Sequence, residues 1–235
     1  MKDHSIYVDW ARYATSIVAK YYYTSTLKAY KQNYNNTLTS EMIFTEADVS
    51  TSDEQVEKLT REFNIHYISF IRSLIYLLST RVDLSFAVHK LAKFSTDPGK
   101  VLFEGLIHLL IYIRGKKTLG LKYYAGRNDA PVTDLLRKVC IKTENHFMDF
   151  SDSSWQDCPN TGRSTEAYII FYQGGPIDNG IHVPGIVAQS SAESEYNPAC
   201  TAGMALAHFR LFIHELLNKD PDKVSEEASL IVLDM

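Results

Sequence analysis

Apolar side chains recur at helical spacing through the middle of the chain, in three successive stripes. The apolar positions are Ile68, Ile71, Leu74, Ile75 and Leu78, then Leu84, Val88, Leu91 and Phe94, then Leu102, Leu106, Leu109, Leu110 and Ile113. Because residues three and four positions apart share one face of a helix, the stripes predict three amphipathic helices. Short turns between such helices favour an antiparallel bundle. Ahead of them, Ser52-Asp-Glu-Gln55 is typical of a capping box and predicts a further helix that runs to about Phe63.

The last third of the chain changes to the period of two that is typical of strands. In a strand over residues 146–152, His146, Met148, Phe150 and Asp152 share one face. Further strands are predicted over residues 165–172, 186–190 and 230–235, and in the last of these Leu230, Val232 and Asp234 share a face. A helix of roughly 25 residues is predicted from about Ala192, with a serine of the Ser190-Ser191 pair as its cap. The order β-β-β-α-β predicts a mixed sheet.

These patterns predict an α/β (α+β) protein in four parts. Residues 1–51 contain a short strand (5–8), a helix (11–20) and a polar loop. Residues 52–125 are the helical segment, residues 126–145 are a linker rich in turn-forming residues, and residues 146–235 are the mixed sheet with its long helix.

Composition places the chain among ordinary globular proteins. Of its 235 residues 45% are hydrophobic and 22% are charged, and its formal net charge of −4 argues against an autonomous nucleic-acid-binding protein while leaving room for local basic clusters. The three cysteines, Cys140, Cys158 and Cys200, lack the spacing of a metal site and indicate reduced thiols. We find no signal peptide or membrane-spanning segment, so we expect an intracellular protein, cytoplasmic or nuclear, with no membrane partner.

Three acidic residues form a candidate metal site. Asp152 and Asp234 lie at the ends of predicted strands, and Glu195 lies four residues before Ala199, which begins the apolar stripe of the long helix. We expect these three carboxyl groups to cluster at one end of the sheet, with Glu193 and Asp149 pointing elsewhere. For any single acid a turn or a solvated edge is the simpler interpretation, but three acids from three elements favour a site for a hard cation.

A resemblance supports this interpretation. The segments Phe150-Ser-Asp-Ser-Ser-Trp155, Gly162-Arg-Ser-Thr165, Tyr168-Ile-Ile-Phe171, Gly174-Gly-Pro-Ile177 and Val187 to Tyr196 resemble, in order and spacing, the ribonuclease H domain of copia-type LTR retrotransposon Pol polyproteins. Upstream, the segments Ile71 to Val88 and Leu109 to Leu121 are similar to the helical end of the reverse transcriptase in those polyproteins.

The resemblance implies a thumb-like helical bundle followed by a truncated ribonuclease H-like domain. In the family, this domain hydrolyses the RNA strand of RNA–DNA hybrids with two divalent metals, Mg²⁺ or Mn²⁺, and Asp152, Glu195 and Asp234 match its first three metal-binding carboxylates. The chain stops before the family's fourth acid, and Pro198 follows Glu195 closely, so we expect a Pol fragment with impaired hydrolysis that depends on the remaining Pol segments. The alternative is a non-catalytic remnant, or a domesticated protein that binds protein or nucleic acid.

Six basic residues follow the helical stripes: Arg81, Lys90, Lys93, Arg114, Lys116 and Lys117. The simpler interpretation makes them polar faces and helix C-termini, where the helix dipole favours cations. The functional interpretation is that some of them contact the backbone of a nucleic-acid duplex, as the thumb does in the resembled family.

Overall fold

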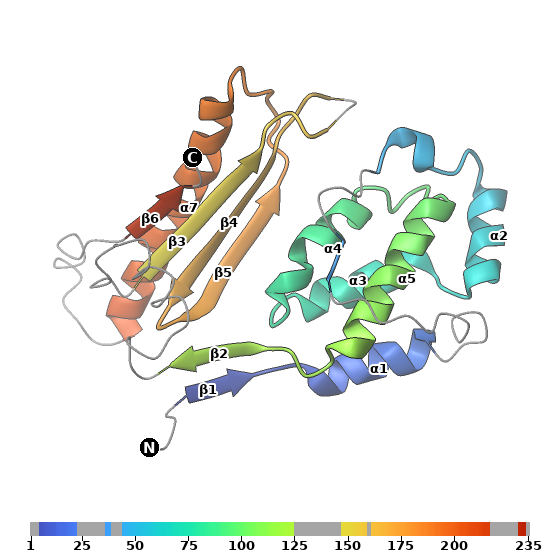
Figure 1. Ribbon diagram of the computed structural model, residues 1–235, viewed down its shortest axis with the longest axis horizontal. Helices are drawn as coiled ribbons and strands as arrows, with labels where there is room; N and C mark the ends of the chain where they lie inside the picture. The colour runs from blue at the N-terminus through green and yellow to red at the C-terminus, as the bar shows by residue number, and fades with distance from the viewer. Residues whose placement is uncertain are drawn as a thin grey trace. The chain divides into compact units, whose positions relative to one another are not determined.

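The computed structural model describes residues 5–22, 36–38, 44–124, 147–158, 161–216 and 230–233. The chain divides into a helical unit, residues 8–121, and a sheet unit, which combines residues 1–7 with residues 122–235. The chain contains both helices and strands, which confirms the predicted α/β class (Figure 1). The predicted linker at 126–145 and most of the polar loop before residue 44 lie outside the described residues.

The helical unit contains five α-helices among its described residues. They are α1 (Ala11–Tyr22), α2 (Asp53–Phe63), α3 (Tyr67–Leu77), α4 (Ser85–Ala92) and α5 (Lys100–Gly115), with the short 3₁₀ helices η2 (Glu46–Asp48) and η3 (Val82–Leu84). The four helices α2 to α5 confirm those predicted over residues 52–115, but the predicted capping box of α2 does not form, because the Ser52 side chain makes no cap hydrogen bond. No helix in the described part of the chain is both long and apolar enough to cross a membrane.

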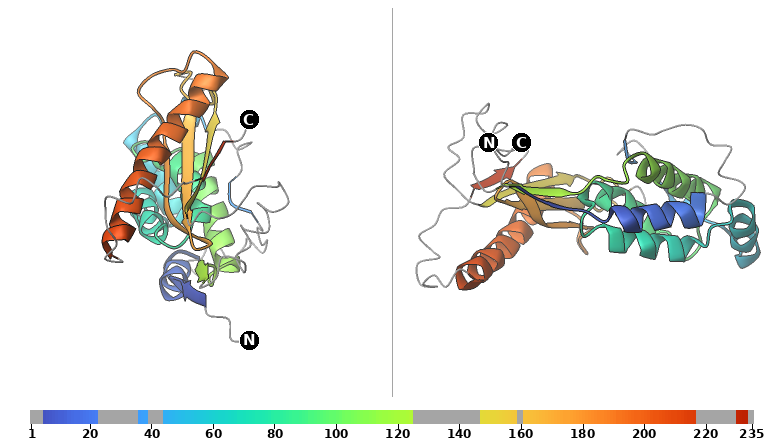
Figure 2. Two further views of the ribbon diagram at one scale, coloured as in Figure 1. Left: turned by 90° about the vertical axis from the view of Figure 1, so that its left-hand side faces the viewer. Right: turned by 90° about the horizontal axis from the view of Figure 1, so that it is seen from below.

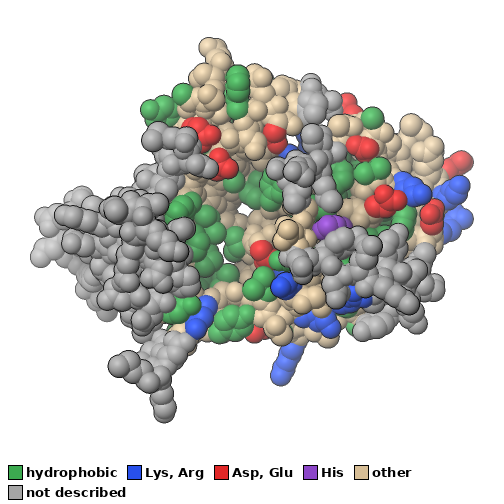
Figure 3. Space-filling view, in the orientation of Figure 1, with side chains coloured by type: hydrophobic (Ala, Val, Ile, Leu, Met, Phe, Trp, Pro, Cys, Tyr) green, Lys and Arg blue, Asp and Glu red, His purple; other side chains and the backbone are tan. Residues whose placement is uncertain are grey.

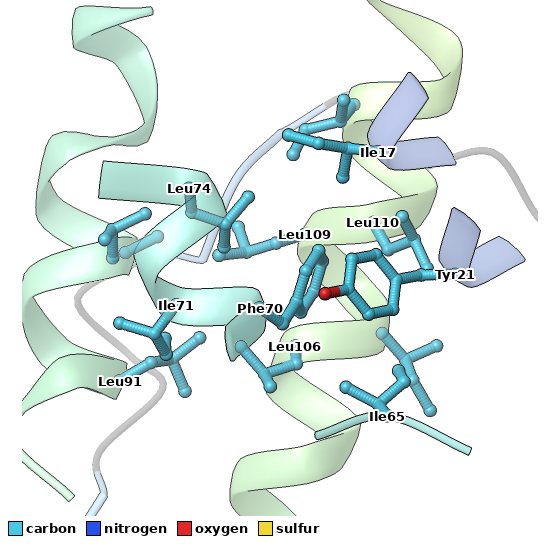
Figure 4. Close-up of a cluster of buried hydrophobic side chains, with 14 of the residues drawn as sticks. Ile17, Tyr21, Ile65, Phe70, Ile71, Leu74, Leu91, Leu106, Leu109 and Leu110 are labelled. Atoms are coloured by element: carbon cyan, nitrogen blue, oxygen red, sulfur yellow. The ribbon is translucent and has the colours of Figure 1, made fainter. Parts of the chain in front are cut away.

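The core of the helical unit forms around α5, whose apolar residues Leu102, Leu106, Leu109, Leu110 and Ile113 are all fully buried. Figure 4 shows side chains of α1, α3 and α4 packed against this stripe. The predicted stripes of α4 and α5 are therefore confirmed.

The predicted stripe of α3 is partly wrong, because the helix carries two apolar faces. Tyr67, Phe70, Leu74 and Leu77 are buried, whereas Ile68 and Ile75 are 36% and 51% exposed. Tyr67 lies edge-on to Phe103 and Phe70 packs on Tyr21. The larger aromatic side chains bury more apolar surface and so determine which face turns inward.

The sheet unit has four strands in the order β5-β4-β3-β6 and one long helix. The strands are β3 (Phe147–Ser154), β4 (Thr165–Tyr172), β5 (Gly175–His182) and β6 (Leu230–Leu233), and the helix is α7 (Ser191–Leu216). β4 is antiparallel to β3 and β5, while β6 is parallel to β3. This arrangement confirms the predicted mixed sheet, and α7 lies against one face of it (Figure 2). A separate two-stranded sheet pairs β1 (Ser5–Val8) with β2 (Leu121–Tyr124).

The third strand of the sheet is not where the sequence predicts it. Residues 186–190 are irregular, and the strand is β5, which follows β4 after a two-residue turn. Gln173 and Gly174 in that turn have φ angles of 51° and 75°, which is typical of the tight turns that join hairpin strands. Gly175 and Pro176 suggest a longer turn, but β5 is an edge strand, where proline is tolerated.

Candidate functional site

The alternation of β3 determines which side chains face α7. Phe147 forms a buried cluster with Ile170 of β4 and Leu206 of α7. Asp149 is paired with Ile170 across the two strands, so Phe147, Asp149, Ser151 and Ser153 form the face beneath α7. Met148, Phe150, Asp152 and Ser154 form the opposite face, where Phe150 contacts Phe171 edge-on.

Asp152 is therefore on the face of β3 that points away from α7. Its side chain is exposed, and its Oδ1 accepts a hydrogen bond of 2.8 Å from the amide of Ser153. The sequence predicts that Asp149 and Asp152 point in different directions; in the structure Asp149 faces α7 and Asp152 faces away from it. The sequence left the inner face ambiguous, because Phe147 marks one face as strongly as Met148 and Phe150 mark the other.

Glu195 lies near the start of α7, which begins at Ser191. The helix is capped by Ser190, whose Oγ accepts a hydrogen bond from the Glu193 amide (3.1 Å), and Glu193 Oε2 accepts one from the Gln189 amide (2.7 Å). This confirms that one of the two serines is the cap and shows that Glu193 has a local role.

The first turns of α7 are one residue out of phase with the predicted stripe, because Ser194 and Pro198 are buried there and not Glu195 and Ala199. Ala202 and Leu206 are buried as predicted, whereas Phe212 and Leu216, the last residues of the predicted stripe, are 51% and 65% exposed. Glu195 is consequently half-buried at the margin of the inner face. Pro198 lies inside the continuous helix and faces the sheet.

The third predicted ligand, Asp234, lies outside the described residues, one position after β6. Among the described residues, no three carboxylate, imidazole or thiol groups are arranged so that they could hold a metal ion. The structure thus places Asp152 on the face of β3 that points away from α7, and Glu195 on α7 itself.

A row of buried polar side chains lies beneath α7, which the sequence pattern does not predict. Asp149, Ser151 and Glu166 are 0%, 4% and 1% exposed, and Glu166 is paired with Ser153 across the strands. Within the described part of the chain, neither carboxylate oxygen of Asp149 has a hydrogen-bond partner, and burial raises its pKa to about 6. This carboxyl group is therefore kept largely protonated in mildly acidic solution.

Glu166 has a side-chain partner on the neighbouring strand, which the sequence pattern does not predict. Its Oε2 lies 3.0 Å from Nε2 of His182, which is opposite it on β5. Side chains that contact each other at paired positions on neighbouring strands stabilise the sheet. Tyr168 also makes a cross-strand contact, because its hydroxyl donates to Asp178 (3.1 Å), and burial with the nearby carboxylates raises the pKa of Tyr168 to about 12.

Arg81, one of the six basic residues considered for contact with nucleic acid, is buried and is bound by other groups of the protein. It is 1% exposed, and its Nε and Nη2 donate to the two carboxylate oxygens of Asp83, each at 2.8 Å. Its Nη1 donates to the carbonyl of Lys116 (3.0 Å), and its guanidinium lies over the ring of Tyr112. A buried guanidinium with these partners offers no surface to a nucleic-acid backbone.

The other five cations keep some exposure. Lys93 and Lys116 are exposed, while Lys90, Arg114 and Lys117 are half-buried. The ammonium group of Lys90 lies over the ring of Phe86 in α4. That of Lys93 lies over the ring of Phe94, just after α4. These five remain candidates for contact with a nucleic acid.

Comparison with known proteins connects the chain to retrotransposons. "Secreted RxLR effector protein 161" of Plasmopara viticola is 29% identical over 134 residues, which cover 57% of this chain and 83% of that protein. An uncharacterized mitochondrial protein of Arabidopsis thaliana is 29% identical over 123 residues, which cover 51% of this chain and 96% of that protein. The retrovirus-related Pol polyprotein from transposon TNT 1-94 of Nicotiana tabacum is 26% identical over 162 residues.

The match to the Pol polyprotein covers 68% of this chain and only 11% of the polyprotein. No family model matches the chain, and no solved structure matches it. The similarity to Pol polyproteins supports a retrotransposon-derived protein.

Proposed function

We propose that the chain is a fragment of a copia-type reverse transcriptase/ribonuclease H polyprotein, and that it hydrolyses RNA–DNA hybrids slowly or not at all. The observation that carries the proposal is the sheet unit, in which three antiparallel strands are followed by a long helix and a fourth strand parallel to the first. This is the order expected for a ribonuclease H-like domain, and the similarity to Pol polyproteins points the same way. The partners in this proposal are an RNA–DNA hybrid and the remaining Pol segments.

The proposed impairment follows from the positions of the carboxylates. Hydrolysis with two metals requires carboxylates that converge on both ions. Asp152 is exposed on the face away from α7, whereas Glu195 belongs to α7 itself. Among the described residues no three candidate ligands come together, and we propose that Mg²⁺ or Mn²⁺ binds weakly at most.

The test is a cleavage assay with a labelled RNA–DNA hybrid in Mn²⁺, comparing the chain with its Asp152→Asn variant. We expect little or no cleavage by either protein. The matched control is Asp149→Asn, a change of the same kind three residues earlier on the same strand. Rapid cleavage that is lost in Asp152→Asn and kept in Asp149→Asn would show that the carboxylates do assemble a working centre.

The second candidate is a non-catalytic retroelement remnant or a domesticated binding protein. The outward position of Asp152, on the face of β3 away from α7, favours it, because a binding protein does not need its carboxylates to converge. It predicts a gel shift of the hybrid with no product at any enzyme concentration, whereas slow cleavage that depends on Asp152 would favour the Pol fragment.

A further inference from the structure

Three aromatic rings gather at one end of the helical unit. Trp10, just before α1, lies 5.2 Å from Tyr76 of α3 and 6.3 Å from Tyr13 of α1, and Tyr13 lies 5.0 Å from Tyr76, all between ring centroids. Trp10 is 38% exposed and Tyr76 is 54% exposed. We call these three residues the aromatic platform.

The aromatic platform is held by the helices beneath it. The Tyr13 hydroxyl donates to the carbonyl of Ser73 (3.3 Å), which ties α1 to α3. Asp9 caps α1 by accepting from the amide of Ala11 (2.7 Å), so the chain is also fixed next to Trp10. Rings that are already fixed lose little conformational entropy when a flat ligand stacks on them.

Basic side chains lie at the same end of the unit. The end of α3 leads to Arg81, whose guanidinium donates to the carbonyl of Lys116. The chain after Lys117 then passes close to the start of α1, because a Cβ placed on Gly120 would lie 2.4 Å from the carbonyl oxygen of Val8. Buried Arg81 thus holds the backbone of Lys116 at the end of the unit that carries the aromatic platform, and exposed Arg72 lies one turn before Tyr76 on α3.

Asp9 and Asp83 lie at this end of the unit as well, but acidic side chains are more numerous at the opposite end of α5. The bridge between Val49 and Pro98 and the stacking of Phe63 on Phe103 place η2 and α2 beside the start of α5. These two elements carry six acidic residues, Glu46, Asp48, Asp53, Glu54, Glu57 and Glu62, and two basic ones, Lys58 and Arg61. Because α5 has 16 residues, about 24 Å separate the acidic end from the basic end. Figure 3 shows lysine and arginine side chains gathered over α1, on the lower side of the helical unit.

We propose that the aromatic platform, with Arg72, Lys116 and Lys117, is a binding site for single-stranded nucleic acid. Exposed aromatic rings accept the faces of unpaired bases, and lysine and arginine side chains at the margin neutralise phosphates. Bases within a duplex are already stacked on each other, so a duplex has no faces to offer the platform. This site uses none of the carboxylates of the sheet unit and goes beyond the proposed function.

The test measures binding of the full chain to a fluorescein-labelled oligothymidylate by fluorescence anisotropy, with a duplex of the same length as a second probe. We expect the single strand to bind more tightly than the duplex. Replacing Trp10 and Tyr76 by alanine should weaken binding of the single strand about tenfold or more, because each stacked base contributes substantially. Tyr76→Phe keeps the ring and should keep the affinity.

Two controls separate stacking from charge and from general loss of aromatic surface. Tyr196→Ala removes an aromatic side chain that is 71% exposed on α7 and should leave the affinity unchanged. Replacing Lys116 and Lys117 by glutamate should weaken binding and reduce its dependence on salt. The unfolding curve of each variant establishes that the helical unit remains folded.

Three results would overturn the proposal. The first is an equal affinity of the chain and its Trp10→Ala, Tyr76→Ala variant for the single strand, including no binding by either. The second is a preference for the duplex. The third is association of the chain with itself that disappears in the same variant, which would show that a second copy covers the aromatic platform.

Discussion

At the scale of single residues, burial decides what a charged side chain does. Arg81 and Arg61 both form ion pairs, at 2.8 Å with Asp83 and 2.9 Å with Glu57, yet Arg81 is 1% exposed and the Arg61 side chain is 78% exposed. An exposed pair contributes little stability, whereas removal of one partner from a buried pair leaves an uncompensated charge. Sequence shows the charge of Arg81 but not its burial, so its role as a buried anchor could not be predicted.

Asp149 gives a prediction about pH. Its folded-state pKa, about 6, is above the ordinary value of 3.8, so the folded protein binds this proton more tightly than the unfolded chain does. The resulting stability is present below about pH 4, falls as the pH rises through 6, and is lost above it. Asp149→Asn, which carries no charge, should therefore raise the free energy of unfolding at pH 8 by up to about 3 kcal/mol and have a small effect at pH 4.

The measurement is urea unfolding of both proteins at the two pH values. Asp152→Asn is the matched control, because Asp152 is exposed on the other face of the same strand, and it should change stability little at either pH. A gain from Asp149→Asn that is the same at pH 4 and pH 8 would contradict the assignment of the effect to ionisation.

At the scale of elements, features that depend on hydrogen bonds between nearby residues were predictable from the sequence. Features that depend on packing between distant residues were not. The start of α7 was predictable because Ser190 and Glu193 make their hydrogen bonds within five residues of each other. β5 was not predictable, because Gly175 and Pro176 suggest a turn and only the edge position of the strand accommodates them. The face of α7 was predicted correctly at Ala202 and Leu206 and missed by one residue in the first turns, where Ser194 and Pro198 are buried.

The cap of α7 can be tested with two adjacent serines. Ser190→Ala removes the oxygen that accepts from the Glu193 amide and should lower the free energy of unfolding by about 1 kcal/mol. Ser191→Ala, at the first helical position, should have almost no effect, and Ser190→Asp should preserve the cap. Thermal unfolding followed by circular dichroism measures all three, and an equal loss from both alanine variants would refute the assignment of Ser190.

At the scale of the whole molecule, the edges of the sheet govern association. β6 has four residues and lies at one edge, and among the described residues no strand pairs with its outer side. Unpaired strand edges invite pairing with another chain, whereas Pro176 and Asp178 protect the β5 edge.

We therefore expect the isolated chain to form oligomers or to have poor solubility. Size-exclusion chromatography with light scattering, run over a range of protein concentrations, should show a mass that increases with concentration. A monomer at every concentration, with a single cooperative melting transition, would show that the β6 edge is protected.

The pairing of β1 with β2 has a consequence for how the chain is made. On the ribosome, Ser5–Val8 leaves the exit tunnel before the helical unit, but its partner, Leu121–Tyr124, is synthesised only after that unit. At roughly 5–20 residues per second, this delay is on the order of ten seconds. Throughout that time the helical unit is able to fold while the first strand waits, so translation speed sets how long an unpaired strand is exposed to chaperones and to neighbouring nascent chains.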